Sequence, residues 1–272
     1  MQHYSISPNE AIVSFWKNRN LISTLVQRDV IGRYRGSVMG ILWSFFNPVF
    51  MLLVYTFVFS VVFKAKWNAG SDSKTEFALV LFAGLIVFNL FSECISRAPT
   101  LILSNVNYVK KVVFPLEILP WVVLGSALFH TVISLLVWLV AYLIFFGMPN
   151  LTVLLLPLIF FPLIMFIMGV SWTLASLGVY LRDVSQFVSV ITTVLMFLSP
   201  IFYPIGALPE QYQKFLLINP LTTAIENTRA ILFWGKVPDM GTFAIYVFGA
   251  LAIAWLGFAW FQKTRKGFAD VI

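Results

Sequence analysis

The chain has 272 residues, of which 60% are hydrophobic and only 11% are charged. This composition excludes a soluble globular protein and indicates a membrane protein, because a water-facing surface needs a larger share of charged residues. The net charge of +7 is accounted for by cationic loops on the cytoplasmic side and by attraction to anionic lipid headgroups, so it does not indicate nucleic-acid binding.

The residue types that carry metal or thiol chemistry are sparse. The single cysteine, Cys94, cannot form an internal disulfide, and the two histidines are too distant in sequence for a metal motif. The 11 acidic residues are scattered singly. We therefore expect no metal site and no catalytic cluster, which argues against a membrane enzyme such as a polyprenyl-phosphate transferase.

Residues 1–35 are predicted to form a cytoplasmic amphipathic helix that lies at the membrane interface. No apolar core of a signal peptide is visible there. The sequence SPNE at 7–10 has the pattern of a capping box, with Pro8 at the first helical position. Apolar residues then recur at near-helical spacing. The alternative is an ordinary membrane anchor with no further role.

Long uncharged runs predict an all-α protein with six spans, because roughly 20 apolar residues cross a bilayer core. An even count places both termini on one side. Twelve of the 18 lysines and arginines then lie on that side, which predicts cytoplasmic termini. The single transmembrane domain, 36–272, has spans at about 36–63, 77–103, 118–146, 151–181, 184–204 and 241–261, with a tight turn, GMPN, at 147–150.

Several polar residues lie within or beside these runs. Glu93 and Arg97 are four apart, so they share a helix face and can form either a structural ion pair or a gating pair. Pro99 predicts that the second span is broken near its cytoplasmic end. His130 is expected to be a hydrogen-bonded helix contact, with a proton relay as the alternative.

The start of the first span combines small residues with a proline. Gly36 and Gly40 would share one helix face and permit close approach of another helix. The pattern either marks a dimer contact or occurs by chance. Asn47-Pro48 is expected to kink the span, because proline removes a backbone donor.

The external region before the last span, 205–239, is too polar to cross the membrane. It is amphipathic and is interrupted at Asn219 and Pro220, which predicts two short re-entrant helices. A hairpin lying on the lipid surface is the alternative.

Four motifs occur in order around these spans: RYRGSVMGILWSFFNP at 33–48, NYVKKVVFPLEILP at 107–120, NPLT at 219–222 and RKGFADVI at 265–272. With them the chain resembles, over essentially its whole length, the membrane subunit of ATP-binding-cassette exporters that move O-antigen, capsule or teichoic-acid polymers. The sequence has no G-x-x-x-x-G-K-[ST] phosphate loop. A separate ATPase that binds ATP and Mg is therefore implied.

The resemblance implies a homodimer with two ATPase copies in the bacterial cytoplasmic membrane, and it assigns roles to particular residues. The docking segment, residues 107–120, would contact the ATPase through Asn107, Tyr108, Lys110, Lys111, Phe114 and Pro115, although a plain lysine-rich loop is the alternative. Arg182 and Asp183 would be a second, smaller contact or a self-contained salt bridge. Arg33 and Arg35 would receive the diphosphate of a lipid-linked glycan or serve only as membrane anchors.

The remaining implied sites concern the transport pathway. Asn219 and Pro220 would belong to an outer gate. Aromatic rings could let a sugar polymer slide past, although each ring could equally be a packing residue. An ATP-driven exporter of a lipid or a drug remains a second hypothesis. The candidate pathway aromatics are Trp43, Tyr55, Trp172, Phe197, Phe202 and Tyr203.

Overall fold

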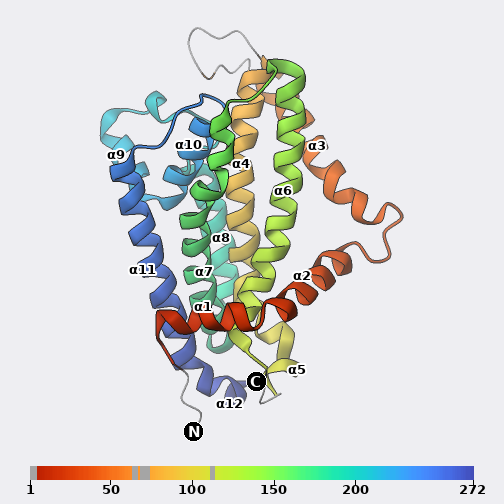
Figure 1. Ribbon diagram of the computed structural model, residues 1–272, viewed down its shortest axis with the longest axis vertical. Helices are drawn as coiled ribbons and strands as arrows, with labels where there is room; N and C mark the ends of the chain where they lie inside the picture. Colours follow the sequence, from red (N-terminus) through yellow and green to blue (C-terminus); the bar gives the residue numbers. More distant parts are fainter. Residues whose placement is uncertain (1–4, 63–66, 68–73, 111–113) are drawn as a thin grey trace.

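The computed structural model describes residues 5–62, 67, 74–110 and 114–272. Over these ranges the chain is almost entirely helical and contains no β-strand. The longest helices run along the long axis of the molecule (Figure 1). They are α4 (Lys74–Arg97), α6 (Leu119–Phe146), α7 (Leu156–Tyr180) and α11 (Met240–Thr264).

Five helical stretches among the described residues are long and apolar enough to cross a membrane. The predicted span at 184–204 differs, because α8 (Val184–Leu198) has only 15 residues and reaches about 22 Å at 1.5 Å per residue. A bilayer core is about 30 Å thick. The five stretches are Gly40–Phe59, Thr75–Thr100, Leu116–Phe146, Leu151–Tyr180 and Met240–Val271.

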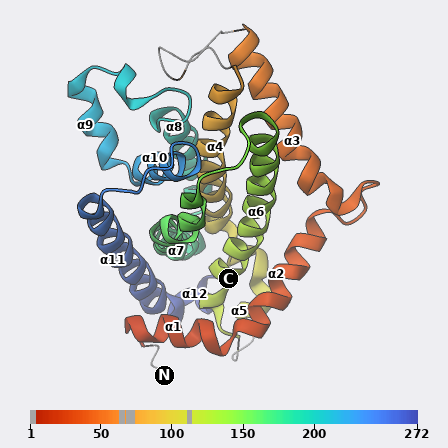
Figure 2. The same ribbon diagram turned by 45° about the horizontal axis from the view of Figure 1, so that its top comes forward.

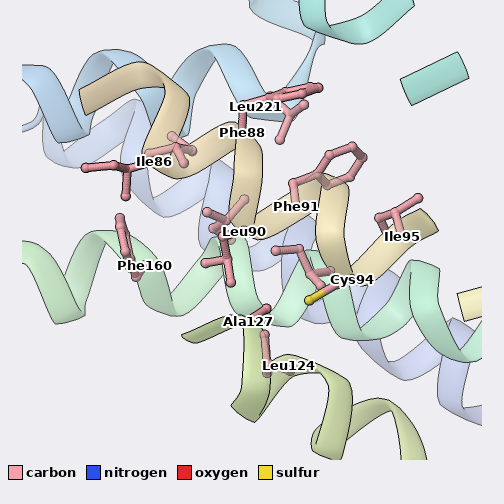
Figure 3. Packing of buried hydrophobic residues seen from close by; sticks show 14 of the residues in the cluster. Ile86, Phe88, Leu90, Phe91, Cys94, Ile95, Leu124, Ala127, Phe160 and Leu221 are labelled. Carbon is pink, nitrogen blue, oxygen red and sulfur yellow. The ribbon is translucent and has the colours of Figure 1, made fainter. Parts of the chain in front are cut away.

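Helix α4 forms the centre of the bundle. It packs against α3, α6, α7, α8 and α10, and most of its span is buried. A helix that is apolar on all sides is stable inside a protein core or a bilayer. Protein surrounds most of α4, as Figure 3 shows for the cluster around Phe88 and Phe91. The α-helix ends at Arg97, two residues before Pro99, and a 3-10 turn follows, so the predicted break is confirmed.

Glycines allow the closest helix contacts. A Cβ built on Gly257 would lie 2.0 Å from the Gly169 carbonyl oxygen, so α7 and α11 cross with their backbones in contact. The predicted shared helix face of Gly36 and Gly40 is wrong. Both have positive φ, 85° and 54°. Gly36 lies in the turn that follows α2, and Gly40 begins the short helical turn before α3. This backbone conformation favours glycine and breaks the helix.

The two ends of the bundle carry different elements. At the end called here the α5 end lie α1 (Pro8–Lys17), α5 (Val106–Val109) and α12 (Phe268–Val271) (Figure 1). At the opposite end, the α10 end, lie α9 (Glu210–Ile218) and α10 (Pro220–Leu232). The predicted interruption at Asn219 and Pro220 is therefore confirmed.

The N-terminal segment differs from a single surface helix. It breaks at Asn18, and α2 (Arg19–Arg33) packs Ile22 and Leu25 against Ile118 and Val122 at the start of α6. Helix α1 instead leaves its apolar residues Ile12, Val13 and Trp16 exposed. Ser7 is the N-cap residue and Pro8 follows it, but the Ser7 side chain makes no capping hydrogen bond.

Helices α2 and α3 (Trp43–Tyr55) diverge from the bundle toward the turn that joins them (Figure 2). Helix α3 continues through Pro48 and passes into a π-helix. At the α10 end, α6 ends at Phe146 and Gly147, with φ of 82°, makes the predicted tight turn. The short helical turns are η1 (Gly40–Leu42), η2 (Thr56–Val62), η3 (Ala98–Thr100), η4 (Leu103–Asn105), η5 (Leu116–Ile118), η6 (Leu151–Leu155), η7 (Ile205–Ala207) and η8 (Arg265–Gly267).

Candidate functional site at the polar cavity

A cavity of about 390 Å³ lies between the end of α2 and helices α3, α4 and α6. It extends along α4 from Glu93 to Phe82, about 16 Å at 1.5 Å per residue. We call it the polar cavity, because amides and hydroxyls share its wall with aromatic rings. Its lining includes Arg33, Tyr34, Trp43, Ser44, Asn47, Tyr55, Phe82, Asn89, Glu93, His130, Thr131 and Ser134.

Four polar side chains meet at one end of the polar cavity. Arg33, in the last turn of α2, forms an ion pair with Glu93 of α4. Arg33 Nη1 also lies 3.2 Å from His130 Nδ1, and the Tyr34 hydroxyl lies 3.0 Å from His130 Nε2. A neutral imidazole that accepts from Arg33 at Nδ1 donates from Nε2 to the tyrosine oxygen. His130 thus has the hydrogen-bonded helix contacts that the sequence predicts.

A second ion pair lies one turn along α4. Arg97 donates from both terminal nitrogens to Asp29 of α2, at 2.9 and 2.7 Å. The predicted Glu93–Arg97 pair is longer, 3.9 Å, because each residue has a nearer partner on α2. Burial opposes ionisation of Asp29, but Arg97, Ser126 and Arg33 together outweigh it and hold the pKa of that carboxyl below its usual range.

The predicted pathway aromatics fall in three places. Trp43 and Tyr55 line the polar cavity. Phe202 lies against Phe197 at the α10 end, with ring centroids 6.0 Å apart and the rings tilted, and the Tyr203 hydroxyl donates to the Phe197 carbonyl. Trp172 contradicts the prediction, since it is 3% exposed in the core of the chain. Its indole nitrogen donates to the Glu117 carbonyl because a buried indole needs an acceptor.

The docking segment contains a short helix, as predicted, but only over Val106–Val109. The Tyr108 and Phe114 rings stack face to face with centroids 4.2 Å apart, and Arg28 donates to the Tyr108 hydroxyl at 2.8 Å. Asn107 and Lys110 are exposed, and Pro115 is partly buried. Lys111 lies outside the described residues.

Sequence reasoning missed the role of Glu117 in the same segment. Its carboxylate accepts from Ser14 of α1 at 2.8 Å and pairs with Arg265 of η8 at 2.5 Å. Arg265 also donates to the Phe114 carbonyl at 3.0 Å. We call these contacts the Glu117 junction. It connects the docking segment to α1 near the N-terminus and to η8 near the C-terminus. The one feature of the sequence that points to it is an acidic residue at the start of an apolar run.

The other predicted contact, Arg182 and Asp183, is the exposed turn between α7 and α8. Across the described part of the chain these two residues form no ion pair with each other, so the self-contained salt bridge is not present. Arg35 is likewise exposed, on the turn after α2.

At the α10 end, Asn219 caps α10. Its side chain accepts from the Leu221 amide and donates to the Ser199 hydroxyl, at 3.0 and 2.9 Å. Pro220 occupies the first turn, where a missing N–H costs nothing. The structure therefore explains both residues through helix capping, and it attaches α10 to the end of α8.

Arg229 of α10 is the second residue that sequence reasoning missed. It is 0% exposed, and it donates to the carbonyls of Val80, Pro200 and Ile201 at 2.9, 2.5 and 2.8 Å. Its guanidinium lies 4.3 Å from the Trp67 ring centroid. A charge of this kind is tolerated in an apolar interior only when its donors are satisfied. Arg229 thereby joins α10 to α4 and to the turn after α8.

Comparisons with known proteins agree with this architecture. The profile of the ABC-2 type transporter family matches residues 20–233. The chain is 28% identical to an O-antigen export system permease protein, RfbA, of Myxococcus xanthus, over 94% of this chain and 97% of that protein. An RfbA of Klebsiella pneumoniae is 26% identical, over 93% of this chain and 95% of that protein.

A further relative is the polysialic acid transport protein KpsM of Escherichia coli, 25% identical over 90% of this chain and 93% of KpsM. These matches cover nearly the whole of each protein, so the similarity includes α2, the bundle and the helices of the α10 end. Because the family profile matches well over half of the residues, this multi-pass membrane protein belongs to the ABC-2 type transporter family.

Proposed function

We propose that this chain is the permease subunit of an ABC transporter that exports a lipid-linked polysaccharide, of the O-antigen class, across the cytoplasmic membrane. The observation that carries the proposal is the polar cavity. It combines a cationic end at Arg33 with an aromatic and amide wall, in a chain whose relatives are named O-antigen export permeases. Export is driven by a separate ATPase subunit that binds ATP and Mg.

The chain crosses the membrane six times in this proposal, with α8 and the turn after it as the fifth crossing. The α5 end faces the cytoplasm, because α1 and α12 both lie there and most of the lysines and arginines lie on that side. Helices α9 and α10 re-enter the outer leaflet, where Asn219 and Pro220 form part of the outer gate.

Arg33 and Arg35 receive the diphosphate of the substrate in this proposal. Guanidinium groups bind phosphate oxygens through paired hydrogen bonds, and Arg33 is 37% exposed at the cavity end. Trp43 and Tyr55 line the same cavity and offer ring faces to the first sugars.

The exposed helices support a homodimer. Only 6% of the best apolar window of the first span is buried within the chain. Helix α8 exposes Gln186, Ser189 and Thr193, which recur at helical spacing. Polar side chains on a membrane helix usually face a partner or a water-filled path. We place the pathway between the α8 helices of two copies related by a two-fold axis.

The docking segment transmits the motion of the ATPase in this proposal. Tyr108, Phe114, Lys110 and Lys111 contact the ATPase, with the Arg182–Asp183 turn as a smaller contact. The Glu117 junction supports this role, since it connects the segment to α1 and to the end of α11.

The proposal is tested by replacing Lys110, Lys111 and Phe114 together with alanine in the transporter reconstituted with its ATPase subunit. We expect ATP hydrolysis to continue while export falls, because in this proposal the residues contact the ATPase, and Phe114 is only partly buried against the hydrophobic core. Circular dichroism should show intact helices. Unchanged export in this variant would contradict the docking role.

A second candidate is export of capsule polysaccharide, which a match to the capsule polysaccharide export inner-membrane protein CtrC of Neisseria meningitidis favours. Identifying the lipid-linked glycan that accumulates in cells lacking this chain separates the two candidates.

A further inference from the structure

Glu93 occupies the position where the proposed substrate phosphate would bind. Its carboxylate pairs with Arg33 and lies 3.4 Å from His130 Nδ1, at the end of the polar cavity. The Glu93 side chain is 21% exposed, so the cavity gives access to it. The cationic end of the cavity therefore already holds one anion, supplied by the chain itself.

A phosphate group and the Glu93 carboxylate compete for the same donors. Both are anionic acceptors that prefer the paired N–H groups of a guanidinium. A diphosphate carries more than one negative charge, so it would repel the Glu93 carboxylate at Arg33 more strongly than the single charge of Asp29 would repel it at Arg97. A substrate that binds Arg33 must therefore displace Glu93.

The displaced carboxylate has a second partner within reach. Arg97 Nη1 lies 3.9 Å from Glu93 Oε1, on the same face of α4. Arg97 uses two of its five N–H groups to donate to Asp29, so further N–H groups can donate to the Glu93 carboxylate. A change of side-chain rotamer is enough to move Glu93 from Arg33 to Arg97, and no charge is left unpaired.

We infer that Glu93 is a built-in competitor that sets the substrate specificity of the cavity. It yields Arg33 only to a headgroup more strongly anionic than itself, such as a diphosphate, and then pairs with Arg97. The single phosphate of a bulk phospholipid does not displace it. This inference rests on the proposed function and adds to it the means by which abundant membrane lipids are excluded.

Exchange of this ion pair also changes how α2 is attached. Arg33–Glu93 and Asp29–Arg97 both connect α2 to α4. Once a diphosphate takes Arg33, the second pair alone joins the two helices, and the turn at the end of α2 is released from α4. Substrate binding thereby removes one of the two ion pairs that hold α2, which forms part of the cavity wall, against α4.

The test uses the transporter reconstituted with its ATPase subunit. Farnesyl diphosphate is titrated against wild type and Glu93→Gln, and the half-maximal concentration for binding is measured with a fluorescent analogue. Inorganic pyrophosphate and phosphatidylglycerol vesicles are the parallel arms. Pyrophosphate is a diphosphate without a lipid chain, so it shows whether binding needs the lipid. Phosphatidylglycerol is a lipid with one phosphate, so it shows whether binding needs the second phosphate.

We expect Glu93→Gln to bind farnesyl diphosphate about tenfold more tightly, equivalent to roughly 1.4 kcal/mol, and to bind phosphatidylglycerol where wild type does not. Glu210→Gln, an exposed acid at the α10 end, should behave as wild type. Arg97→Gln should weaken binding, because the displaced carboxylate loses its second partner.

The double variant separates this mechanism from simple damage to the fold. If Arg97 acts through Glu93, the effect of Arg97→Gln disappears in the Glu93→Gln background. Equal or weaker diphosphate binding by Glu93→Gln, with normal binding by wild type, overturns the inference and leaves the proposed function standing. Failure of wild type to bind farnesyl diphosphate overturns the proposed phosphate site together with the inference.

Discussion

Two arginines of this chain are held in opposite ways. Arg229 at the α10 end is 0% exposed and donates to three backbone carbonyls as well as to Glu226 of its own helix. Arg33 at the polar cavity is 37% exposed and contacts side chains, those of Glu93 and His130. Carbonyls of helices and turns cannot move without moving the backbone, but a carboxylate can rotate away. Arg229 therefore fixes the fold, and Arg33 is free to change partners.

The largest effect on stability is expected from Arg229→Leu. The substitution leaves the buried Pro200 and Ile201 carbonyls of the turn after α8 without the arginine donor, and each unsatisfied group costs about 1–3 kcal/mol. It also removes the ion pair of Arg229 with Glu226. The melting temperature of the purified protein in detergent should fall sharply, and export should be lost with it. A melting temperature equal to that of wild type would remove the distinction between the two arginines.

Arg33→Gln should give the converse result. Export by the reconstituted transporter is expected to fall about tenfold or more, the change that roughly 1.4 kcal/mol of lost binding produces. The melting temperature should hardly change, because the residue is partly exposed. Arg19→Gln, an exposed arginine next to Trp16, is the matched control and should export normally. Destabilisation as large as that of Arg229→Leu would show that Arg33 is structural as well.

A smaller effect is expected from Gly84→Ala. A Cβ at this position would lie 2.7 Å from Arg229 Nη2, so the guanidinium must shift and its contacts weaken. Gly249→Ala is the control, since a Cβ there meets no atom within 4 Å. The first variant should lower the melting temperature, and the second should leave it unchanged or raise it slightly, as alanine favours helix. Equal behaviour of the two variants would mean that the space beside Arg229 is not critical.

The smallest effect concerns Asp29. Its pKa is lowered in the folded protein because Arg97, Ser126 and Arg33 together outweigh the burial of the carboxyl. The stabilisation is therefore present above the pKa of the unfolded chain and is lost as pH falls through the lower folded value. The melting temperatures of wild type and Asp29→Asn should differ at neutral pH and converge in acid. A difference that persists in acid would point to packing in place of charge.

The sequence predicted much of the helical architecture, because long apolar runs and proline or glycine are local signals. The turn at Gly147, the end of α4 before Pro99 and the interruption at Asn219 were all foreseeable. The predicted span 184–204 overestimated α8, which ends at Leu198, because the apolar run continues past Ser199 and Pro200 and hydropathy does not indicate where a helix stops.

The contacts of the candidate site could not be predicted in the same way. Glu93 and Arg97 looked like partners because they are four residues apart, but α2 supplied nearer ones, Arg33 and Asp29. The same holds for Glu117 and Arg265, which are separated by 148 residues. Such pairs depend on how distant helices pack, and no periodic pattern records that.

The burial of Arg229 was also invisible to sequence reasoning. A single arginine in a polar stretch indicates a surface residue, since charged side chains are rarely fully buried. The carbonyl groups that satisfy it belong to α4 and to the turn after α8, and its space depends on Gly84. Only the assembled fold brings these groups together.

The most direct test of the account is an experimental structure of the transporter with a lipid-linked diphosphate bound. We expect the diphosphate within hydrogen-bonding distance of Arg33, the Glu93 carboxylate moved to Arg97, and Arg229 unchanged in its contacts with Val80, Pro200 and Ile201. A diphosphate bound elsewhere, with Glu93 still paired to Arg33, would contradict the account.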